Sequence, residues 1–358
     1  MSEAFDNAEA NAAAKQLLER WHPLRYVFFE LTSSCNLRCR HCGSRCPGGA
    51  AGETIPAAAF RRVVDRIAGS YPKNQLMFCI TGGEPLLNPD WFDVCSHIAE
   101  RGFSWGMTTN GTLIDAECVE KLSRAGMKTV AVSLDGLRES HEALRGVEGS
   151  FDGAVNALRL LVQSGNFRAV QVVTVVNRLN LEELPRLYEL VCSLGVASWK
   201  LTPIEPIGDA RAHPELFLDE HEHYRLLNFI LQHRRKAAFE ITYGCSHNLP
   251  KRYEEKVRAR SFLCGAGTMI ASVASNGDIL PCLDIDCREK VRQGNVLRDD
   301  FVEVWEKGFT LFRANKALGS PFCRDCPQRQ ECRGDSWHSW DVEENAPRVC
   351  LKNHRVFS

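Results

Sequence analysis

The stretch YVFFELTSSCNLRCRHC, residues 26–42, joins a short apolar segment directly to three closely spaced cysteines. Its first seven residues are rich in aromatic and β-branched side chains, which is typical of a buried strand. Cys35, Cys39 and Cys42 follow with the spacing Cys-x3-Cys-x2-Cys on the loop that leaves this strand. Three thiolates this close together can bind three irons of a [4Fe–4S] cluster and leave the fourth iron open.

Five more apolar runs follow, and each leads into a segment of helical periodicity. The runs are LMFCIT (76–81), FSWGMTT (103–109), TVAVSLD (129–135), VQVVTVV (170–176) and ASWKLTPI (197–204). Strand–helix alternation predicts parallel strands joined by right-handed crossovers. Six units are too few for an eight-unit barrel. We therefore expect an α/β fold with a partial, six-unit parallel β/α barrel over residues 25–235.

The alternation stops after residue 235. FEITYG suggests one further strand, and a charged linking segment is expected over 236–263. Residues 264–358 begin with a hairpin, MIASVASNGDILPC, and then show little apolar periodicity. A small region of this kind usually needs metal for stability, so we expect an irregular, Cys-rich C-terminal domain. Residues 1–24 are expected to form an amphipathic helix lying on the barrel.

Composition excludes several classes of protein. The 358 residues contain 44 Lys+Arg against 45 Asp+Glu, so no basic field favours nucleic acid. No apolar run approaches the roughly 20 residues of a membrane span, and no secretory signal precedes the first strand. We expect a cytoplasmic protein with neither nucleic acid nor membrane as a partner. Sixteen cysteines in a reducing compartment then indicate metal binding or catalysis.

A second motif, TGGEP, ends the second strand. Gly82 and Gly83 let the backbone approach a ligand closely, and Glu84 adds a carboxylate that suits an ammonium group. A zinc knuckle completed by Cys46 or His41 is the alternative for the cysteine loop. Four scattered cysteines are interpreted as inert core thiols: Cys79, Cys95, Cys118 and Cys192.

Together these motifs resemble the radical S-adenosylmethionine (radical SAM) enzymes. CNLRCRHC is similar to their cluster loop, TGGEP to their methionine-amine motif, TTNGTLI to their third-strand end and VSLDG to their fourth-strand motif. The resemblance implies that Cys35, Cys39 and Cys42 hold a [4Fe–4S] cluster that chelates S-adenosylmethionine. Its amine would be held by Gly82, Gly83 and Glu84, with Ser133 near the ribose or methionyl part. Reductive cleavage would give a 5′-deoxyadenosyl radical that abstracts a substrate hydrogen.

The C-terminal third resembles the SPASM extension of radical SAM enzymes, which carries auxiliary iron–sulfur clusters. CGAG…NGDILPC…GNV…VW…CRDCPQRQEC carries this resemblance, but Ser336 and Arg258 stand where the family pattern has cysteine. The cysteine count favours two sets of four ligands, which are Cys245, Cys264, Cys282 and Cys287, and Cys323, Cys326, Cys332 and Cys350. A three-thiolate or two-iron first cluster, with Ser336, Asp335 or His338 nearby, is the competing interpretation.

The resemblance implies a radical SAM/SPASM oxidoreductase that oxidises or crosslinks a side chain of a ribosomally made peptide. It implies an electron donor such as flavodoxin or ferredoxin. Because only about 25 residues precede the barrel, a separate leader-binding protein is a further expected partner. Small molecules stay open as substrates through dehydrogenation, epimerisation or decarboxylation of a tetrapyrrole or aminoglycoside-type sugar, as does sulfatase maturation. A non-enzymatic zinc scaffold is the alternative of another class. The sequence identifies no catalytic acid, base or hydrogen donor.

Overall fold

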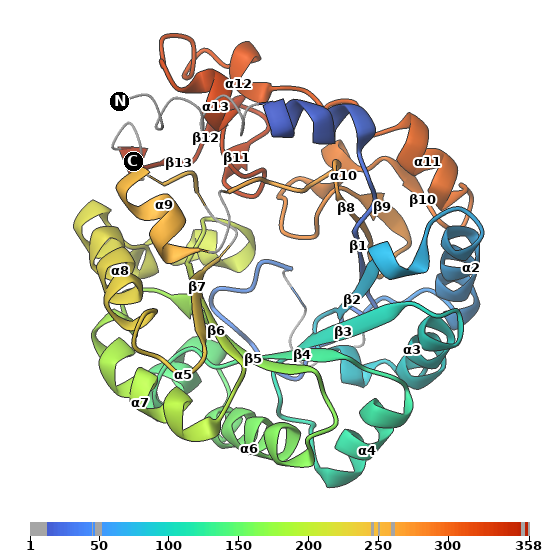
Figure 1. Cartoon of the computed structure of the whole chain (residues 1–358), viewed down its shortest axis with the longest axis vertical. Helices are drawn as coiled ribbons and strands as arrows, with labels where there is room; N and C mark the ends of the chain where they lie inside the picture. Colours follow the sequence, from blue (N-terminus) through green and yellow to red (C-terminus); the bar gives the residue numbers. More distant parts are fainter. Residues whose placement is uncertain are drawn as a thin grey trace.

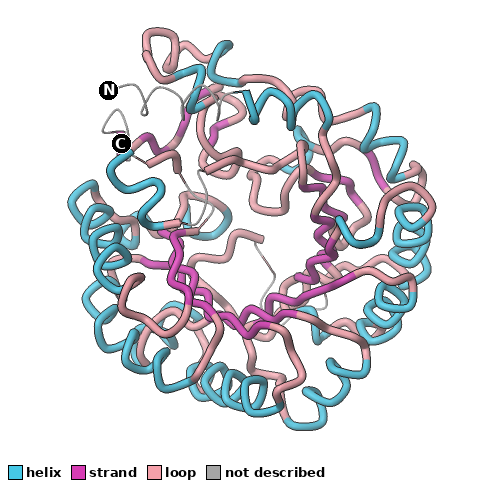
Figure 2. Tube along the Cα trace, in the orientation of Figure 1, coloured by secondary structure: helices cyan, strands magenta, loops and turns pink. Residues whose placement is uncertain are grey.

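The computed structural model describes residues 13–44, 46, 52–244, 247–249, 251–258, 262–351 and 355–356. Its strands line the inside of an incomplete ring, and its helices cover the outside (Figures 1 and 2). The barrel strands are β1 Tyr26–Glu30, β2 Met77–Thr81, β3 Ser104–Thr109, β4 Thr129–Ser133, β5 Ala169–Val176, β6 Ser198–Pro203 and β7 Glu240–Tyr243. They pair in sequence order, and every neighbouring pair is parallel.

The apolar runs predicted the barrel strands correctly. All six expected segments are strands, and FEITYG supplies the seventh, β7. Large side chains such as Phe78, Trp105 and Trp199 are fully buried where the strands meet the helices. Burial of this apolar surface is the main contribution to stability, at about 25 cal/mol per Å² removed from water. The expected partial parallel β/α barrel is confirmed.

The barrel helices follow the strands along the chain. They are α2 Ala57–Ala68, α3 Trp91–Glu100, α4 Ala116–Arg124, α5 Arg138–Arg145, α6 Ser150–Ser164, α7 Leu184–Leu194 and α8 Glu220–His233. Helix α5 was not expected, because its segment RESHEALR has only two apolar residues. This helix ends at Gly146, whose φ of +70° is the left-handed conformation common after a helix.

The C-terminal region continues the barrel sheet. Its hairpin strands β8 Ile270–Val273 and β9 Asp278–Leu280 are antiparallel, and β8 pairs in parallel with β1. The sheet order is therefore β10-β9-β8-β1 and onward to β7, with β10 at Gly294–Asn295. The remaining elements are α9 Lys251–Val257, α10 Arg288–Val291, α11 Phe301–Lys307, α12 Lys316–Gly319, α13 Arg329–Cys332, β11 Trp340–Asp341, β12 Ala346–Pro347, β13 Val349–Cys350 and β14 Arg355–Val356.

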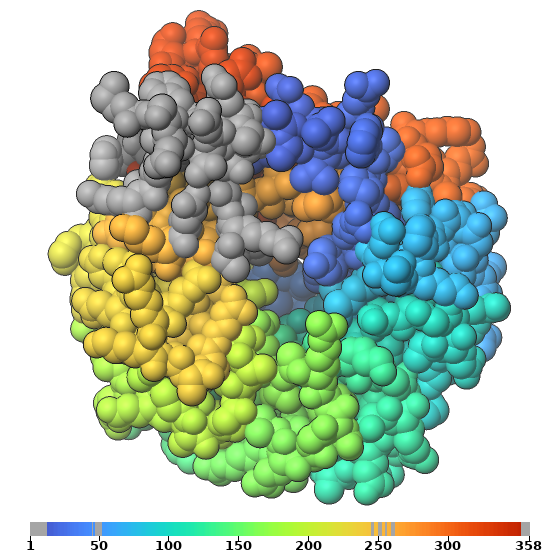
Figure 3. Space-filling model, in the orientation of Figure 1, coloured from blue at the N-terminus to red at the C-terminus, as the bar shows by residue number. Residues whose placement is uncertain are grey.

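The N-terminal helix, residues 13–21, lies on the C-terminal region rather than on the barrel as expected. Lys15 Nζ donates to the backbone oxygen of Glu331 at 2.8 Å, and Glu19 pairs with Arg333. Figure 3 shows the helix in dark blue beside the orange and red surface of that region. The expectation was wrong because amphipathicity indicates that a face is buried, not what buries it.

A buried ion pair joins β1 to the C-terminal region. Glu30 is 1% exposed and accepts two hydrogen bonds from Arg288, each 3.0 Å long. The backbone N–H and hydroxyl of Ser275 also donate to this carboxylate.

In the described part of the chain, no helix is long and apolar enough to cross a membrane.

Candidate active site

A cavity of about 310 Å³ lies at the carboxyl ends of the barrel strands, where β/α barrels place their chemistry. The thiol-bearing side chains of Cys35, Cys39 and Cys42 line it. The ends of β2 and β4 contribute Gly82, Gly83 and Ser133, the predicted S-adenosylmethionine contacts other than Glu84. The structure thus brings together six of the seven residues that the three barrel motifs predicted.

The cysteine loop is fixed by backbone contacts to three elements. Arg38 N–H donates to the backbone oxygen of Arg145 at 3.0 Å, at the end of α5. Glu84 N–H, just after β2, donates to the backbone oxygen of Ser34 at 2.8 Å. Asp209 N–H, in the segment after β6, donates to the backbone oxygen of Cys42 at 2.9 Å. A Cβ on Gly83 would lie 2.2 Å from Ser34 O, so only glycine permits this approach. The glycines bring β2 close to the loop itself.

The three thiols have different environments. Burial raises the pKa of Cys39 to about 11, although Arg145 opposes the shift. A hydrogen bond from the Cys46 thiol lowers the pKa of Cys42 to about 6. Three thiols on one cavity wall, beside a backbone that only glycine permits, fit a cluster with an exchangeable ligand. Among the described residues, no group of three or more His, Cys, Asp and Glu side chains is arranged to hold a metal ion.

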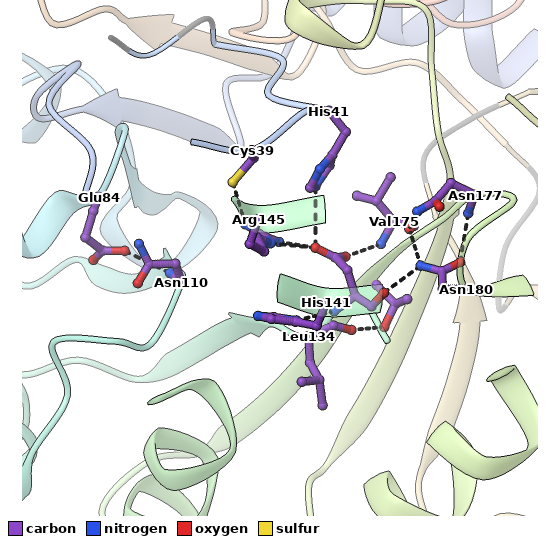
Figure 4. Close-up of polar contacts among 12 residues, drawn as sticks. Cys39, His41, Glu84, Asn110, Leu134, His141, Arg145, Val175, Asn177 and Asn180 are labelled. Carbon is purple, nitrogen blue, oxygen red and sulfur yellow. Dashed lines mark hydrogen bonds and ion pairs between the residues drawn. The ribbon is translucent and has the colours of Figure 1, made fainter. Parts of the chain in front are cut away.

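A buried network supports the cysteine loop from below (Figure 4). Asp135, which follows β4, accepts from Arg145 Nε at 2.6 Å, and His41 Nε2 lies 3.4 Å from the same oxygen. Arg145 Nη1 reaches Cys39 Sγ at 3.6 Å. Burial raises the pKa of Asp135, but the Arg145 guanidinium and His41 outweigh it and hold that pKa well below its usual range. The side chain of Arg145, the last residue of α5, is only 11% exposed.

Glu84 is turned into the protein. Its side chain is fully buried and accepts hydrogen bonds from Thr109 Oγ1 and from the backbone N–H of Asn110, each 2.8 Å long. Burial raises its pKa to about 7. These contacts join the end of β2 to the end of β3. The structure therefore gives Glu84 a bracing role, and its contact with the S-adenosylmethionine amine stays a prediction.

A second polar cluster lines the cavity from β6 and the C-terminal region. Glu205 follows β6, and His247 Nε2 lies 3.1 Å from its Oε1. His338 Nε2 lies 3.7 Å from the same oxygen, and both Glu205 and His338 line the cavity. Neither Glu205 nor His223 was predicted from the sequence, and His223 is 1% exposed with its ring centroid 5.9 Å from that of His247.

The second predicted set of auxiliary ligands is brought together. One small cavity is lined by all four of its cysteines, which are Cys323, Cys326, Cys332 and Cys350. Four cysteines around one cavity are what a shared iron–sulfur cluster requires, and their ligand role stays a prediction. Lys316, 8% exposed, lies beside this group and donates to the backbone oxygen of Asp335 at 2.7 Å.

The first predicted set is less complete. Cys245 lies outside the described residues. Cys282 follows β9, Cys287 directly precedes α10, and Cys264 Sγ accepts from Trp337 N–H at 3.4 Å. Ser336 is fully buried, and its hydroxyl lies 2.5 Å from that of Ser339. Its place next to Trp337 puts it near Cys264, as the family pattern implied for a cysteine at this position.

Two family models match the chain. The Radical SAM superfamily model matches residues 29–191, and SPASM, an iron–sulfur cluster-binding domain, matches residues 264–327. The AdoMet-dependent heme synthase of Methanosarcina barkeri is 28% identical over 332 residues, covering 87% of this chain and 90% of that protein. Mycofactocin maturase MftC of Mycobacterium tuberculosis is 29% identical over 314 residues, covering 86% and 76%.

Solved structures share the fold. Streptococcus suis SuiB bound to S-adenosylmethionine has a TM-score of 0.72 at 18% identity, covering 92% of this chain and 77% of SuiB. Native anSMEcpe with bound AdoMet has a TM-score of 0.71 at 19% identity, covering 93% and 94%.

Residues 29–191 form a domain of the Radical SAM superfamily. The C-terminal region adds a SPASM domain, so the protein is a radical SAM/SPASM oxidoreductase whose cofactors are a [4Fe–4S] cluster, S-adenosylmethionine and auxiliary iron–sulfur clusters. The alternative of a non-enzymatic zinc scaffold is thereby overturned.

Proposed function

We propose that this enzyme oxidises or crosslinks a side chain of a ribosomally made peptide. The charge distribution of the cavity is the observation that carries the proposal. The carboxylates of Glu205 and Asp284 line it, whereas Arg145, the one Arg or Lys among its described lining residues, is already paired with Asp135. Such a surface favours the N–H donors of a peptide over a substrate rich in carboxylates.

The residues of the cavity have separable roles in this reaction. The cluster and S-adenosylmethionine, when bound, supply the radical that removes a substrate hydrogen atom. Cys35, Cys39 and Cys42 would hold the cluster, and Gly82, Gly83 and Ser133 would line the S-adenosylmethionine site. Arg145 and Asp135 fix the loop that carries the thiols. The auxiliary thiols would hold acceptors for the electron that an oxidised product must lose.

Relatives support two substrate classes. MftC is named as a maturase, and one SuiB structure contains its precursor peptide SuiA. The heme synthases match a larger share of their own length, and this observation favours a tetrapyrrole as the second candidate. An electron donor such as flavodoxin or ferredoxin, and a separate leader-binding protein, belong to the proposal.

The test uses anaerobically reconstituted, dithionite-reduced enzyme with S-adenosylmethionine. Short peptides encoded beside the gene are compared with iron coproporphyrin, and mass spectrometry follows 5′-deoxyadenosine and the mass of each candidate. We expect 5′-deoxyadenosine from the wild type and none from Cys39→Ala, together with loss of hydrogen from a peptide. Conversion of the porphyrin with every peptide unchanged would refute the peptide proposal and support the second candidate.

A further inference from the structure

Glu205 is an unusual group to find on the wall of this cavity. Its side chain is 5% exposed, yet it lines the space into which the cluster thiols point. Within the described chain, His247 and His338 both lie near Oε1, at 3.1 and 3.7 Å, whereas Oε2 receives no hydrogen bond. A buried carboxylate with unused acceptor capacity costs several kcal/mol unless a partner arrives. The missing partner is expected from the cavity side.

The wall behind Glu205 is built to keep it in place. His247, 1% exposed, lies between Glu205 and Asp335, with its Nδ1 3.8 Å from Asp335 Oδ2. The backbone N–H groups of Asn248 and Ser336 donate to Asp335 Oδ1 at 2.9 and 2.7 Å. The linking segment, through His247, and the SPASM domain, through Asp335 and His338, therefore both pack against the Glu205 carboxylate at the end of β6. A surface glutamate needs no such support.

The environment keeps Glu205 ionised. Burial raises its pKa, but His247 and His338 outweigh burial and lower that pKa below its ordinary value. Because both histidines lie at Oε1, Oε2 is the carboxylate oxygen left to attract a cation, and a low local dielectric strengthens that attraction. The nearest cavity arginine, Arg145, is paired with Asp135 and does not supply that cation.

We propose that Glu205, with His338 beside it, forms a substrate subsite that binds a cationic nitrogen, an ammonium or guanidinium group. For the proposed peptide substrate this group is the side chain of a lysine or arginine, or the terminal amine, and this assignment rests on the proposed function. The subsite lies on β6, whereas the predicted S-adenosylmethionine contacts lie on β2 and β4. It would anchor the substrate so that a carbon next to the anchor faces the radical.

Small probes test the subsite without knowledge of the substrate. Reconstituted enzyme with bound S-adenosylmethionine is examined by saturation-transfer NMR with n-butylammonium and with its neutral isostere 1-butanol. A probe of this size is expected to bind with a dissociation constant on the order of 1 mM. The variants are Glu205→Gln, Asp284→Asn in the same cavity, and the matched surface control Glu182→Gln. Glu182 is exposed and paired only with Arg225 among the described residues.

The wild type and Glu182→Gln should transfer at least about threefold more saturation to the ammonium than to the alcohol. Glu205→Gln should abolish that preference, with S-adenosylmethionine affinity and iron content unchanged, whereas Asp284→Asn should retain it. An undiminished preference in Glu205→Gln, or its loss only in Asp284→Asn, overturns the subsite.

A second arm separates the subsite from the proposed function. A modified peptide with one basic residue is compared with its norleucine analogue, and the analogue should raise KM at least tenfold in the wild type but not in Glu205→Gln. Equal KM values in the wild type overturn the subsite while the peptide function stands. Binding of n-butylammonium through Glu205 without any peptide product overturns the peptide function while the subsite stands.

Discussion

At the scale of single residues, the least predictable part of the site is the charge beneath the cysteine loop. The motif VSLDG suggested Ser133, whereas the buried charge is Asp135, and its partner Arg145 ends α5, a helix that was not expected. Local periodicity contains no signal for this pairing, because only the turn at Gly146 and the path of α5 bring the two together. Glu205 and His247 were missed for the same reason, since they meet only in the folded chain.

Arg145→Met should destabilise the enzyme by about 3–5 kcal/mol, because it leaves Asp135 buried without its cation. In the wild type the pKa of Asp135 is lowered, so the pair stabilises the fold above about pH 4 and is lost as pH falls below that value. In the variant burial dominates and raises this pKa, so stability should fall as pH rises. Melting temperatures at pH 6 and 8.5 measure the difference.

The control for this substitution is Arg138→Met on the same helix. Arg138 is exposed and pairs with Asp152 at the surface, and an exposed pair of this kind contributes little to stability. An Arg145→Met variant that melts like this control at both pH values would show that the Arg145–Asp135 pair does not stabilise the enzyme.

Gly83→Ala should displace the cysteine loop, because the added Cβ would lie 2.2 Å from Ser34 O and 2.9 Å from Cys35 Cβ. We expect the barrel to fold, at least tenfold weaker S-adenosylmethionine binding, and about four fewer irons per chain if the cluster is lost. Gly69→Ala is the matched control, since its Cβ would meet nothing closer than 3.7 Å. Equal S-adenosylmethionine affinity in the two variants would refute the close-approach explanation.

At the scale of elements, the sequence predicted what depends on local pattern and missed what depends on pairing. The barrel strands were found because buried parallel strands are nearly continuous apolar runs. The hairpin β8–β9 was recognised from its NGD turn, but its pairing with β1 was not, because Tyr26 and Ile270 are neighbours only in the sheet. The two sets of auxiliary cysteines were grouped by count, and only the second set, around α12 and α13, is seen to share a cavity.

The shared cavity makes a prediction about iron. Cys350→Ala should lower the iron content by about four atoms per chain, because it removes one of four thiols from a single cluster. Cys95→Ala, which changes a fully buried thiol in the barrel core, should leave iron unchanged. Iron and acid-labile sulfide are measured after identical reconstitution, and full iron in Cys350→Ala would remove Cys350 from the ligand set.

At the scale of the whole molecule, the barrel and the SPASM domain are parts of one sheet. The expected boundary at residue 264 falls between segments that fold as neighbours, since β8 covers the edge of β1 and Arg288 neutralises the buried Glu30. The first strand thus has the cysteine loop at its end, the barrel on one side and the auxiliary region on the other. This pairing fixes the position of the hairpin β8–β9, which Cys282 follows, relative to the strand that carries the cysteine loop.

A chain ending at residue 263 should therefore fail to give a stable barrel. Removal of residues 264–358 would expose the edge of β1 from Tyr26 to Phe29 and would leave Glu30 buried without Arg288. An unpaired apolar strand edge favours aggregation. We expect oligomers on size exclusion and no cooperative melting, while the full chain stays cooperative. Arg288→Met in the full chain isolates the ion pair and should cost about 3–5 kcal/mol. A monomeric, cooperatively melting 1–263 fragment would show that the barrel is an independent domain and that the shared sheet is incidental to its stability.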